Sequence, residues 1–232
     1  MIDSSKSLVG VGLYSVPEAA RLSHVSSQRI RRWIRGYRRG SNPGSRQYAS
    51  IWRPDLPYIE GIVALSFRDL MEVRFVNAFR VHGVSWKIIR LAAQKAMEFL
   101  ETDHPFSSRT FRTDGKRIFA DFTEVSGHRK LLDLVRDQFA FPKIVEPSLY
   151  EGLEFSEGDE IVRWWPMGPN KRIILDPERS FGQPIDNESG VQAQILADAY
   201  SAEHSVERVA ILFDVDERAV NDAIEFEEEL AA

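Results

Sequence analysis

The sequence predicts an α+β chain that is mainly helical, and three observations support this class. Apolar residues recur at the three- and four-residue spacing of a helix across residues 14–39, 66–101 and 192–229. Short strand-like runs, interrupted by proline, lie between residues 105 and 172. Hydrophobic residues make up 43% of the 232 residues, enough for the packed cores of one large domain or two small ones. We therefore expect helical ends joined by a β-hairpin or small sheet.

Residues 14–39 predict two short helices joined by a tight turn. Ser15 is suited to cap the first helix, and Glu18, three residues on, completes a capping box. Residues 23–25 form the turn, and Ser26 is suited to cap the second helix. This arrangement is typical of a helix-turn-helix.

The second of these helices has an apolar face and a basic face. Ile30, Trp33 and Ile34 have the spacing that faces a core. The opposite face carries Gln28, Arg29, Arg31, Arg32 and Arg35. A basic second helix after a short turn predicts a DNA reader that inserts this helix into the major groove.

The charge pattern agrees with DNA binding. No acidic residue lies between Glu18 and Asp55, although the whole chain has a net charge of −5. The same interval holds nine arginines: Arg21, Arg29, Arg31, Arg32, Arg35, Arg38, Arg39, Arg46 and Arg53. Duplex phosphate is the commonest anion that matches such a surface. The alternative is a basic face that is simply solvated.

The predicted DNA contacts fall into two groups. Arginine recognises guanine and glutamine recognises adenine, so base contacts are assigned to the start of the second helix. These residues are Ser26, Ser27, Gln28, Arg29, Arg31 and Arg32. Phosphate contacts are assigned to Arg35, Arg38, Arg39 and Arg46.

Residues 36–65 predict a basic loop that leads into short strands. The second helix is broken by Gly36 and Gly40, and the run Asn42-Pro43-Gly44 marks a loop after it. Strand composition follows at Ile51-Trp52 and at residues 58–65. This segment is interpreted either as a wing that touches DNA or as a mobile surface loop.

Residues 66–101 predict two further helices whose apolar stripes belong to a core, and Ser66 and Asp69 give a capping signal at the start of the first. With the preceding segments they resemble a MerR-type DNA-binding domain over residues 10–101. The resemblance rests on the order of the two-helix segment and basic loop, followed by Leu65–Leu70 (LSFRDL) and Gly83–Trp86 (GVSW). It implies a winged helix-turn-helix and dimers on palindromic DNA. No cysteine or other ligand motif follows, so a metal- or drug-sensing activator is not supported.

Residues 105–172 are interpreted as a β-rich connecting region. Asp114-Gly115 predicts a hairpin, and residues 127–139 predict a helix. Strand candidates follow near residue 144 and at residues 149–155 and 161–165. Trp164 and Trp165 are adjacent, so they point to opposite faces of a strand, and one of them is a candidate protein contact.

Residues 173–232 predict a domain of three helices, over residues 192–200, 205–213 and 216–229. The run Asp176-Pro177, followed by Ser180-Phe181-Gly182-Gln183-Pro184, resembles the small antitoxin-associated domain often encoded beside PIN-like toxins. The family's glycine–threonine–arginine turn is replaced by residues 187–190 (NESG). The helices have helix-turn-helix spacing, but the third carries carboxylates that would repel phosphate. Between Val191 and Ala232 there are eleven acidic and two basic residues, so this end predicts protein binding instead.

Nothing in the sequence indicates an enzyme, a cofactor or a metal site. The five histidines are scattered, there are no cysteines, and no phosphate-binding loop or nucleophile elbow is present. The N-terminus does not have the pattern of a signal peptide, and no apolar run approaches the ~20 residues of a membrane span. We expect a cytoplasmic protein.

The two resemblances together indicate a VapB-type antitoxin of a type II toxin–antitoxin system. They imply a homodimer that represses its own operon by binding operator DNA and neutralises a PIN-like (VapC-type) ribonuclease toxin. The candidate partner contacts are Trp164, Trp165, Phe181 and Phe226. Two alternatives stay open: a stand-alone MerR-like transcription factor with a sensing or dimerising C-terminal half, and a phage or plasmid adaptor.

Overall fold

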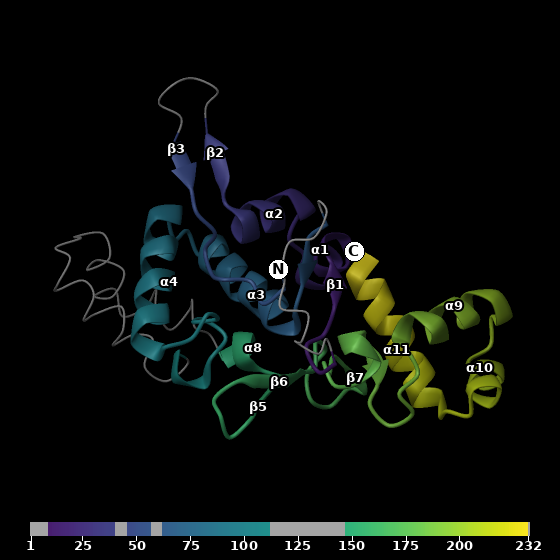
Figure 1. Ribbon diagram of the computed structural model, residues 1–232. Coiled ribbons are helices and arrows are strands. Elements are labelled where there is room, and N and C mark those ends of the chain that lie inside the picture. The colour runs from purple at the N-terminus through teal and green to yellow at the C-terminus, as the bar shows by residue number, and fades with distance from the viewer. Residues whose placement is uncertain (1–8, 40–45, 57–61, 112–146, 232) are drawn as a thin grey trace. The chain divides into compact units, whose positions relative to one another are not determined.

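The computed structural model describes residues 9–39, 46–56, 62–111 and 147–231 (Figure 1). The fold class is α+β and mainly helical, as predicted, with four two-stranded sheets among the described residues. The chain divides into two compact units. The N-terminal unit comprises residues 15–150 and 157–160, and the C-terminal unit comprises residues 1–14, 151–156 and 161–232. No described helix has the length and apolar character that crossing a membrane requires.

The N-terminal unit is built around α3, whose buried side chains form the centre of its core. Its helices are α1 (Val16–Ser23), α2 (Ser27–Arg35), α3 (Phe67–Val81), α4 (Trp86–Leu100) and α8 (Pro147–Tyr150). Strand β1 (Tyr14–Ser15) pairs with β4 (Ala64–Leu65), and β2 (Tyr37–Arg39) pairs with β3 (Arg46–Tyr48). Leu70, Met71, Val73 and Val76 of α3 are fully buried.

Capping signals in the sequence set the starts of two of these helices. The predicted capping box of Ser15 and Glu18 is present at α1, and Ser66 and Asp69 form a second one at α3. Ser26 is the N-cap residue of α2, as predicted, but its side chain makes no capping hydrogen bond. Burial of the apolar face therefore stabilises α2 in place of a side-chain cap.

The strand prediction for Ile51-Trp52 is wrong. Both side chains are buried, but the backbone bends there, and the Ile51 amide donates to the Trp33 carbonyl oxygen over 2.9 Å. The hairpin is formed earlier in the chain, by β2 and β3. Of the predicted strand at residues 58–65, β4 occupies the end. The predicted hairpin at Asp114-Gly115 and the predicted helix at 127–139 lie outside the described residues.

The C-terminal unit combines two small antiparallel sheets with three helices. Strands β5 (Leu153–Phe155) and β6 (Ile161–Trp164) pair, as do β7 (Ile173–Ile174) and β8 (Ile185–Asp186). A short 3₁₀ helix, η1 (Ser180–Gly182), precedes β8. The helices are α9 (Ala193–Glu203), α10 (Val206–Phe213) and α11 (Glu217–Ala231), close to the three predicted ranges.

Candidate nucleic-acid interface

The turn between α1 and α2 is held from inside the N-terminal unit. His24 ends α1 in the left-handed region at φ 52°, and the Val25 amide donates to the Ala20 carbonyl oxygen over 3.2 Å. Ile30, Trp33 and Ile34 bury the inner face of α2, and the Trp33 ring lies 5.3 Å from that of Trp86 at the start of α4. The orientation of α2 is thus fixed by the core.

This packing leaves the predicted DNA-reading residues on the outer face. Arg29, Arg31 and Arg32 are exposed and form no ion pair within the part of the chain that the structure describes. Ser26, Gln28 and Arg35 are also exposed, and Ser27 is half-buried. A helix that presents several unneutralised guanidinium groups has the electrostatic character of a phosphate-binding surface.

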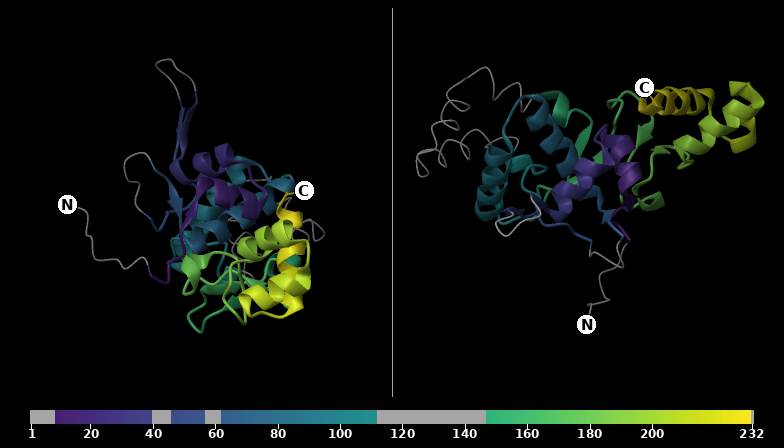
Figure 2. Two further views of the ribbon diagram at one scale, coloured as in Figure 1. Left: turned by 90° about the vertical axis from the view of Figure 1, so that its right-hand side faces the viewer. Right: turned by 90° about the horizontal axis from the view of Figure 1, so that it is seen from above.

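The β2–β3 hairpin projects beyond the helices of its unit and starts directly after α2 (Figure 1 and Figure 2). Tyr37 and Tyr48 pair across it, with ring centroids 4.8 Å apart and planes inclined by 17°. The guanidinium of Arg32 lies 5.8 Å from the centre of the Tyr37 ring, and that of Arg90 lies 5.6 Å from the centre of Tyr48. These contacts connect α2, the hairpin and α4.

Three of the four arginines predicted to contact phosphate, Arg38, Arg39 and Arg46, lie in this hairpin, and the fourth, Arg35, ends α2. Arg38 is exposed in β2, and the backbone register places Arg39 opposite Arg46. Sequence reasoning missed the two tyrosines and Arg90, although the occurrence of a tyrosine with arginine in both YRR and RQY was a visible signal.

A shallow hollow of about 240 Å³ lies beside α2, at the first turn of α1. It is lined by Ser15, Val16, Pro17, Arg31, Arg35, Ile62 and Val63. Arg31 and Arg35 are one turn apart, and the N-terminal end of α1 adds partial positive charge. The structure thus groups Arg31 with Arg35, a residue assigned to phosphate, rather than with the base-reading residues.

Gly36 joins α2 to the hairpin and requires the absence of a side chain. Its φ is +73°, and a Cβ there would collide with the backbone of Tyr48 and Ala49. Replacing Gly36 by alanine is expected to lower the free energy of unfolding by about 1–3 kcal/mol and to weaken DNA binding, since the hairpin must shift. Gly83→Ala is the matched control, because Gly83 also has a positive φ, of +81°, but a Cβ added there would meet no atom within 4 Å. Fluorescence anisotropy measures the DNA affinity of both variants. Equal effects of the two substitutions would show that the position of the hairpin does not matter for DNA binding.

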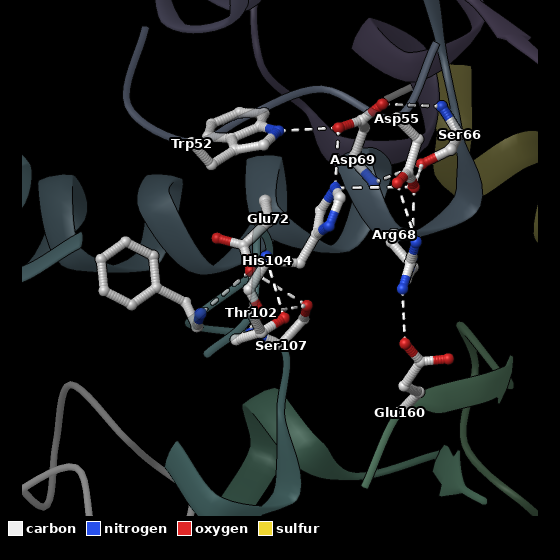
Figure 3. A network of polar contacts seen from close by, with 11 residues as sticks. Trp52, Asp55, Ser66, Arg68, Asp69, Glu72, Thr102, His104, Ser107 and Glu160 are labelled. Carbon is white, nitrogen blue, oxygen red and sulfur yellow. Dashed lines mark hydrogen bonds and ion pairs between the residues drawn. The ribbon is translucent and has the colours of Figure 1, made fainter. Parts of the chain in front are cut away.

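Inside the N-terminal unit, a buried polar network connects α3 to the segments around residues 52–55 and 102–107 (Figure 3). Asp69 is fully buried and accepts hydrogen bonds from Trp52 Nε1 over 2.7 Å and the Ser66 amide over 3.0 Å. Its Oδ1 also lies 3.0 Å from His104 Nε2. Asp55 accepts from Ser66 Oγ and Arg68. Sequence reasoning missed this network, since histidine and acidic residues far apart in the chain give no spacing signal.

Glu72, one turn further along α3, fixes the segment that follows α4. Its Oε1 accepts hydrogen bonds from the amides of Phe106 and Ser107, over 2.9 and 3.0 Å, and from Ser107 Oγ. Its Oε2 and the Nδ1 of His104 are buried and have no hydrogen-bond partner among the described residues.

Burial and neighbouring charges shift several pKa values in this network. Burial raises the pKa of Glu72 to about 7. For His104, burial acts to lower the pKa, but the hydrogen bond to Asp69 and the charges of Asp69, Glu72 and Asp55 outweigh it, so the pKa is raised. For Asp55, burial acts to raise the pKa, but the charge of His104 and the hydrogen bonds from Arg68 and Ser66 hold it below its usual value.

Asp55, Asp69 and His104 also have the residue types and spacing to hold a metal ion, with ligand atoms within 4.8 Å of one another. Their hydrogen bonding does not fit this role. Oδ2 of Asp55 already accepts from Ser66 Oγ and Arg68 Nε, and Oδ1 of Asp69 accepts from Trp52. The Arg68 guanidinium also supplies the positive charge that a metal would bring. We interpret the cluster as a structural ion-pair network.

The network predicts that stability falls as pH rises above about 5. The folded state binds more protons than the unfolded state, because Glu72 titrates near 7 instead of 4.5. The raised pKa of His104 acts in the same direction, since its stabilising charge is lost as pH rises from 6.5 through the folded pKa. The free energy of unfolding should decrease by about 1–3 kcal/mol up to pH 8. Chemical denaturation at a series of pH values across this range measures the decrease. Glu72→Gln should reduce the dependence of the free energy of unfolding on pH. Glu98→Gln is the exposed control and should leave that dependence unchanged.

The predicted partner contacts separate into buried and exposed side chains. Trp164 and Phe226 are 5% and 2% exposed and belong to the core of the C-terminal unit. Trp165 is half-buried, and Phe181 is 62% exposed in the left-handed backbone region at φ 54°. Of these four residues, Phe181 offers the most surface to a partner.

Comparison with known proteins places the chain in a family. No family model matches the sequence. The chain is 30% identical over 227 residues to a protein of Mycobacterium tuberculosis (strain ATCC 25618 / H37Rv) named "Putative antitoxin VapB45", and the match covers 93% of each chain. Its structure is similar to the X-ray crystal structure of Rv2018 from Mycobacterium tuberculosis, with a TM-score of 0.72 and 26% identity, over 93% of this chain and 99% of that one. An antitoxin is a regulatory protein and not an enzyme. The chain therefore belongs to the VapB45-like antitoxin family.

Proposed function

We propose that this antitoxin binds the operator of its own operon through α2 and the β2–β3 hairpin, and thereby represses transcription. The observation that carries this proposal is the set of exposed guanidinium groups of Arg29, Arg31 and Arg32 on α2, which form no ion pair among the described residues. A helix held by its apolar side, with a basic outer side, suits insertion into the major groove in a MerR-like winged helix-turn-helix.

The geometry refines the assignment of individual contacts. Gln28, Arg29 and Arg32 are assigned to base edges, with Ser26 and Ser27 beside them. Arg31 is assigned to a phosphate, because it shares the hollow beside α1 with Arg35. Arg38, Arg39 and Arg46 contact the backbone from the hairpin.

The second part of the proposal is that the chain neutralises a PIN-like ribonuclease in the cytoplasm. The name of the relative supports a toxin partner. The acidic C-terminal helices suit a basic protein surface and disfavour nucleic acid there. A homodimer would place two α2 helices on the two halves of a palindromic operator, which multiplies weak single-site contacts.

Co-purification of the chain expressed from its native operon tests both parts. We expect a small ribonuclease encoded in the same operon to co-purify, identified by mass spectrometry, and its cleavage of RNA to be suppressed. We also expect the complex to shift the operator fragment in a gel and to leave a scrambled fragment unshifted. Absence of any operon-encoded nuclease would contradict the antitoxin mechanism, and equal binding to both fragments would contradict operator recognition.

A further inference from the structure

The outer face of α10 departs from the pattern of an ordinary surface helix. Val209 and Ala210 are buried, and α10 packs against α9 and α11. The next two residues, Ile211 and Leu212, are 75% and 66% exposed. A surface helix normally carries polar residues at such positions, so these side chains are not explained by folding of the unit.

The local structure of α10 does not depend on these two side chains. Ser205 Oγ accepts from the Arg208 amide at the start of the helix, and Asp214 ends it in the left-handed region at φ 53°. Ile195 of the neighbouring helix α9 is a further aliphatic residue that is 44% exposed. In Figure 1, α10 lies at the edge of the group formed by α9, α10 and α11. Contiguous exposed apolar surface with a rim of polar residues is the pattern of a protein-binding surface.

The charges around these residues identify the kind of partner. Glu203, Glu207, Asp214 and Glu217 are exposed around α10. The exposed arginines nearest to these residues in the sequence, Arg208 and Arg218, each lie beside a carboxylate: Arg208 Nη1 is 3.9 Å from Glu203 Oε2, and Arg218 Nε is 3.8 Å from Asp222 Oδ2. A second copy of the chain would bring the same acidic surface and be repelled, whereas a surface rich in lysine or arginine would be attracted.

We propose that the α10 surface, defined by Ile211 and Leu212 with Glu207 and Asp214 beside them, is the docking site for the toxin. This inference rests on the proposed antitoxin function and adds the location of the contact. The two aliphatic side chains enter an apolar hollow of the nuclease, and the carboxylates pair with basic side chains at the rim of that hollow. Burial of the aliphatic side chains supplies affinity, and the charges supply orientation and association rate.

Calorimetric titration of the full-length chain with the operon-encoded nuclease tests this surface. The double variant Ile211→Ser/Leu212→Ser should bind the nuclease about tenfold or more weakly, because it removes the apolar anchors. The matched control is Val81→Ser at the end of α3, since Val81 is also 75% exposed and should leave binding unchanged. A second variant, Glu207→Lys/Asp214→Lys, should weaken binding and reduce its dependence on salt. A thermal unfolding midpoint and an operator affinity equal to those of the wild-type chain would show that each variant is folded.

The outcomes separate this inference from the proposed function. Nuclease binding at wild-type strength by the serine variant overturns the α10 site, while the antitoxin function stands. Loss of self-association by that variant, with nuclease binding unchanged, also overturns it and assigns the surface to a second copy. Failure of the wild-type chain to bind the nuclease overturns the proposed function and this inference with it.

Discussion

Replacing Arg29, Arg31 and Arg32 together by alanine is expected to weaken operator binding by about a hundredfold or more. Each arginine that contacts a base contributes about 1–3 kcal/mol, and every 1.4 kcal/mol is about tenfold in affinity. All three side chains are exposed, so the fold should be retained. Fluorescence anisotropy with a labelled operator duplex measures the change.

Single substitutions should separate the roles of these arginines. Arg32→Ala should weaken specific binding more than non-specific binding, while Arg31→Ala should weaken both equally, because Arg31 is assigned to a phosphate. Arg208→Ala is the control, since this exposed arginine lies on α10 in the C-terminal unit. An unchanged operator affinity for the triple variant would exclude α2 as the reading helix.

Replacing Asp69 by alanine is expected to lower the free energy of unfolding by about 3–5 kcal/mol. The substitution removes the carboxylate that lies nearest to the buried ring of His104, leaving only the more distant Asp55 and Glu72, and it removes the acceptor for Trp52 Nε1. Loss of one partner from a buried charge pair is among the most destabilising single changes. The capping box of α3 is lost as well. Chemical denaturation followed by circular dichroism measures the effect.

An exposed acidic residue provides the comparison for Asp69. Glu98 lies in an exposed ion pair with Lys95, and Glu98→Ala should change stability by no more than about 0.5 kcal/mol. The stability loss for Asp69→Asn should lie between those for Glu98→Ala and Asp69→Ala, because an amide oxygen can still accept a hydrogen bond from Trp52. A loss of only about 1 kcal/mol or less for Asp69→Ala, the size of one ordinary hydrogen bond, would show that the network adds little to stability.

Local patterns in the sequence were sufficient to predict the helices of both ends. Two local signals were informative: the capping boxes at Ser15 and Ser66, and the apolar spacing of α2. Each depends on residues within a few positions of one another, which is the range over which sequence patterns are informative. The three C-terminal helices were predicted for the same reason. The acidic third helix and the arginine face of α2 were also visible directly in the sequence.

Features that depend on distant residues could not be predicted. Ile51 and Trp52 have strand composition, but the contacts of Trp52 with Asp69, and of Ile51 with Trp33, decide their conformation. Asp69 was expected only as a capping residue, and its hydrogen bond to His104 joins residues 35 positions apart. Likewise, Trp164 and Phe226 are aromatic residues of kinds common at interfaces, but packing in the C-terminal unit buries them.

The central claim is that the arginine face of α2 and the hairpin bind duplex DNA, and the salt dependence of operator affinity tests it most directly. For contacts to phosphate, the logarithm of the affinity should fall linearly with the logarithm of salt concentration, with a slope of about −0.9 for each phosphate neutralised. The five arginines assigned to phosphate, Arg31, Arg35, Arg38, Arg39 and Arg46, therefore predict a slope of about −4 to −5 for each protomer. An operator affinity that is independent of salt would contradict the account.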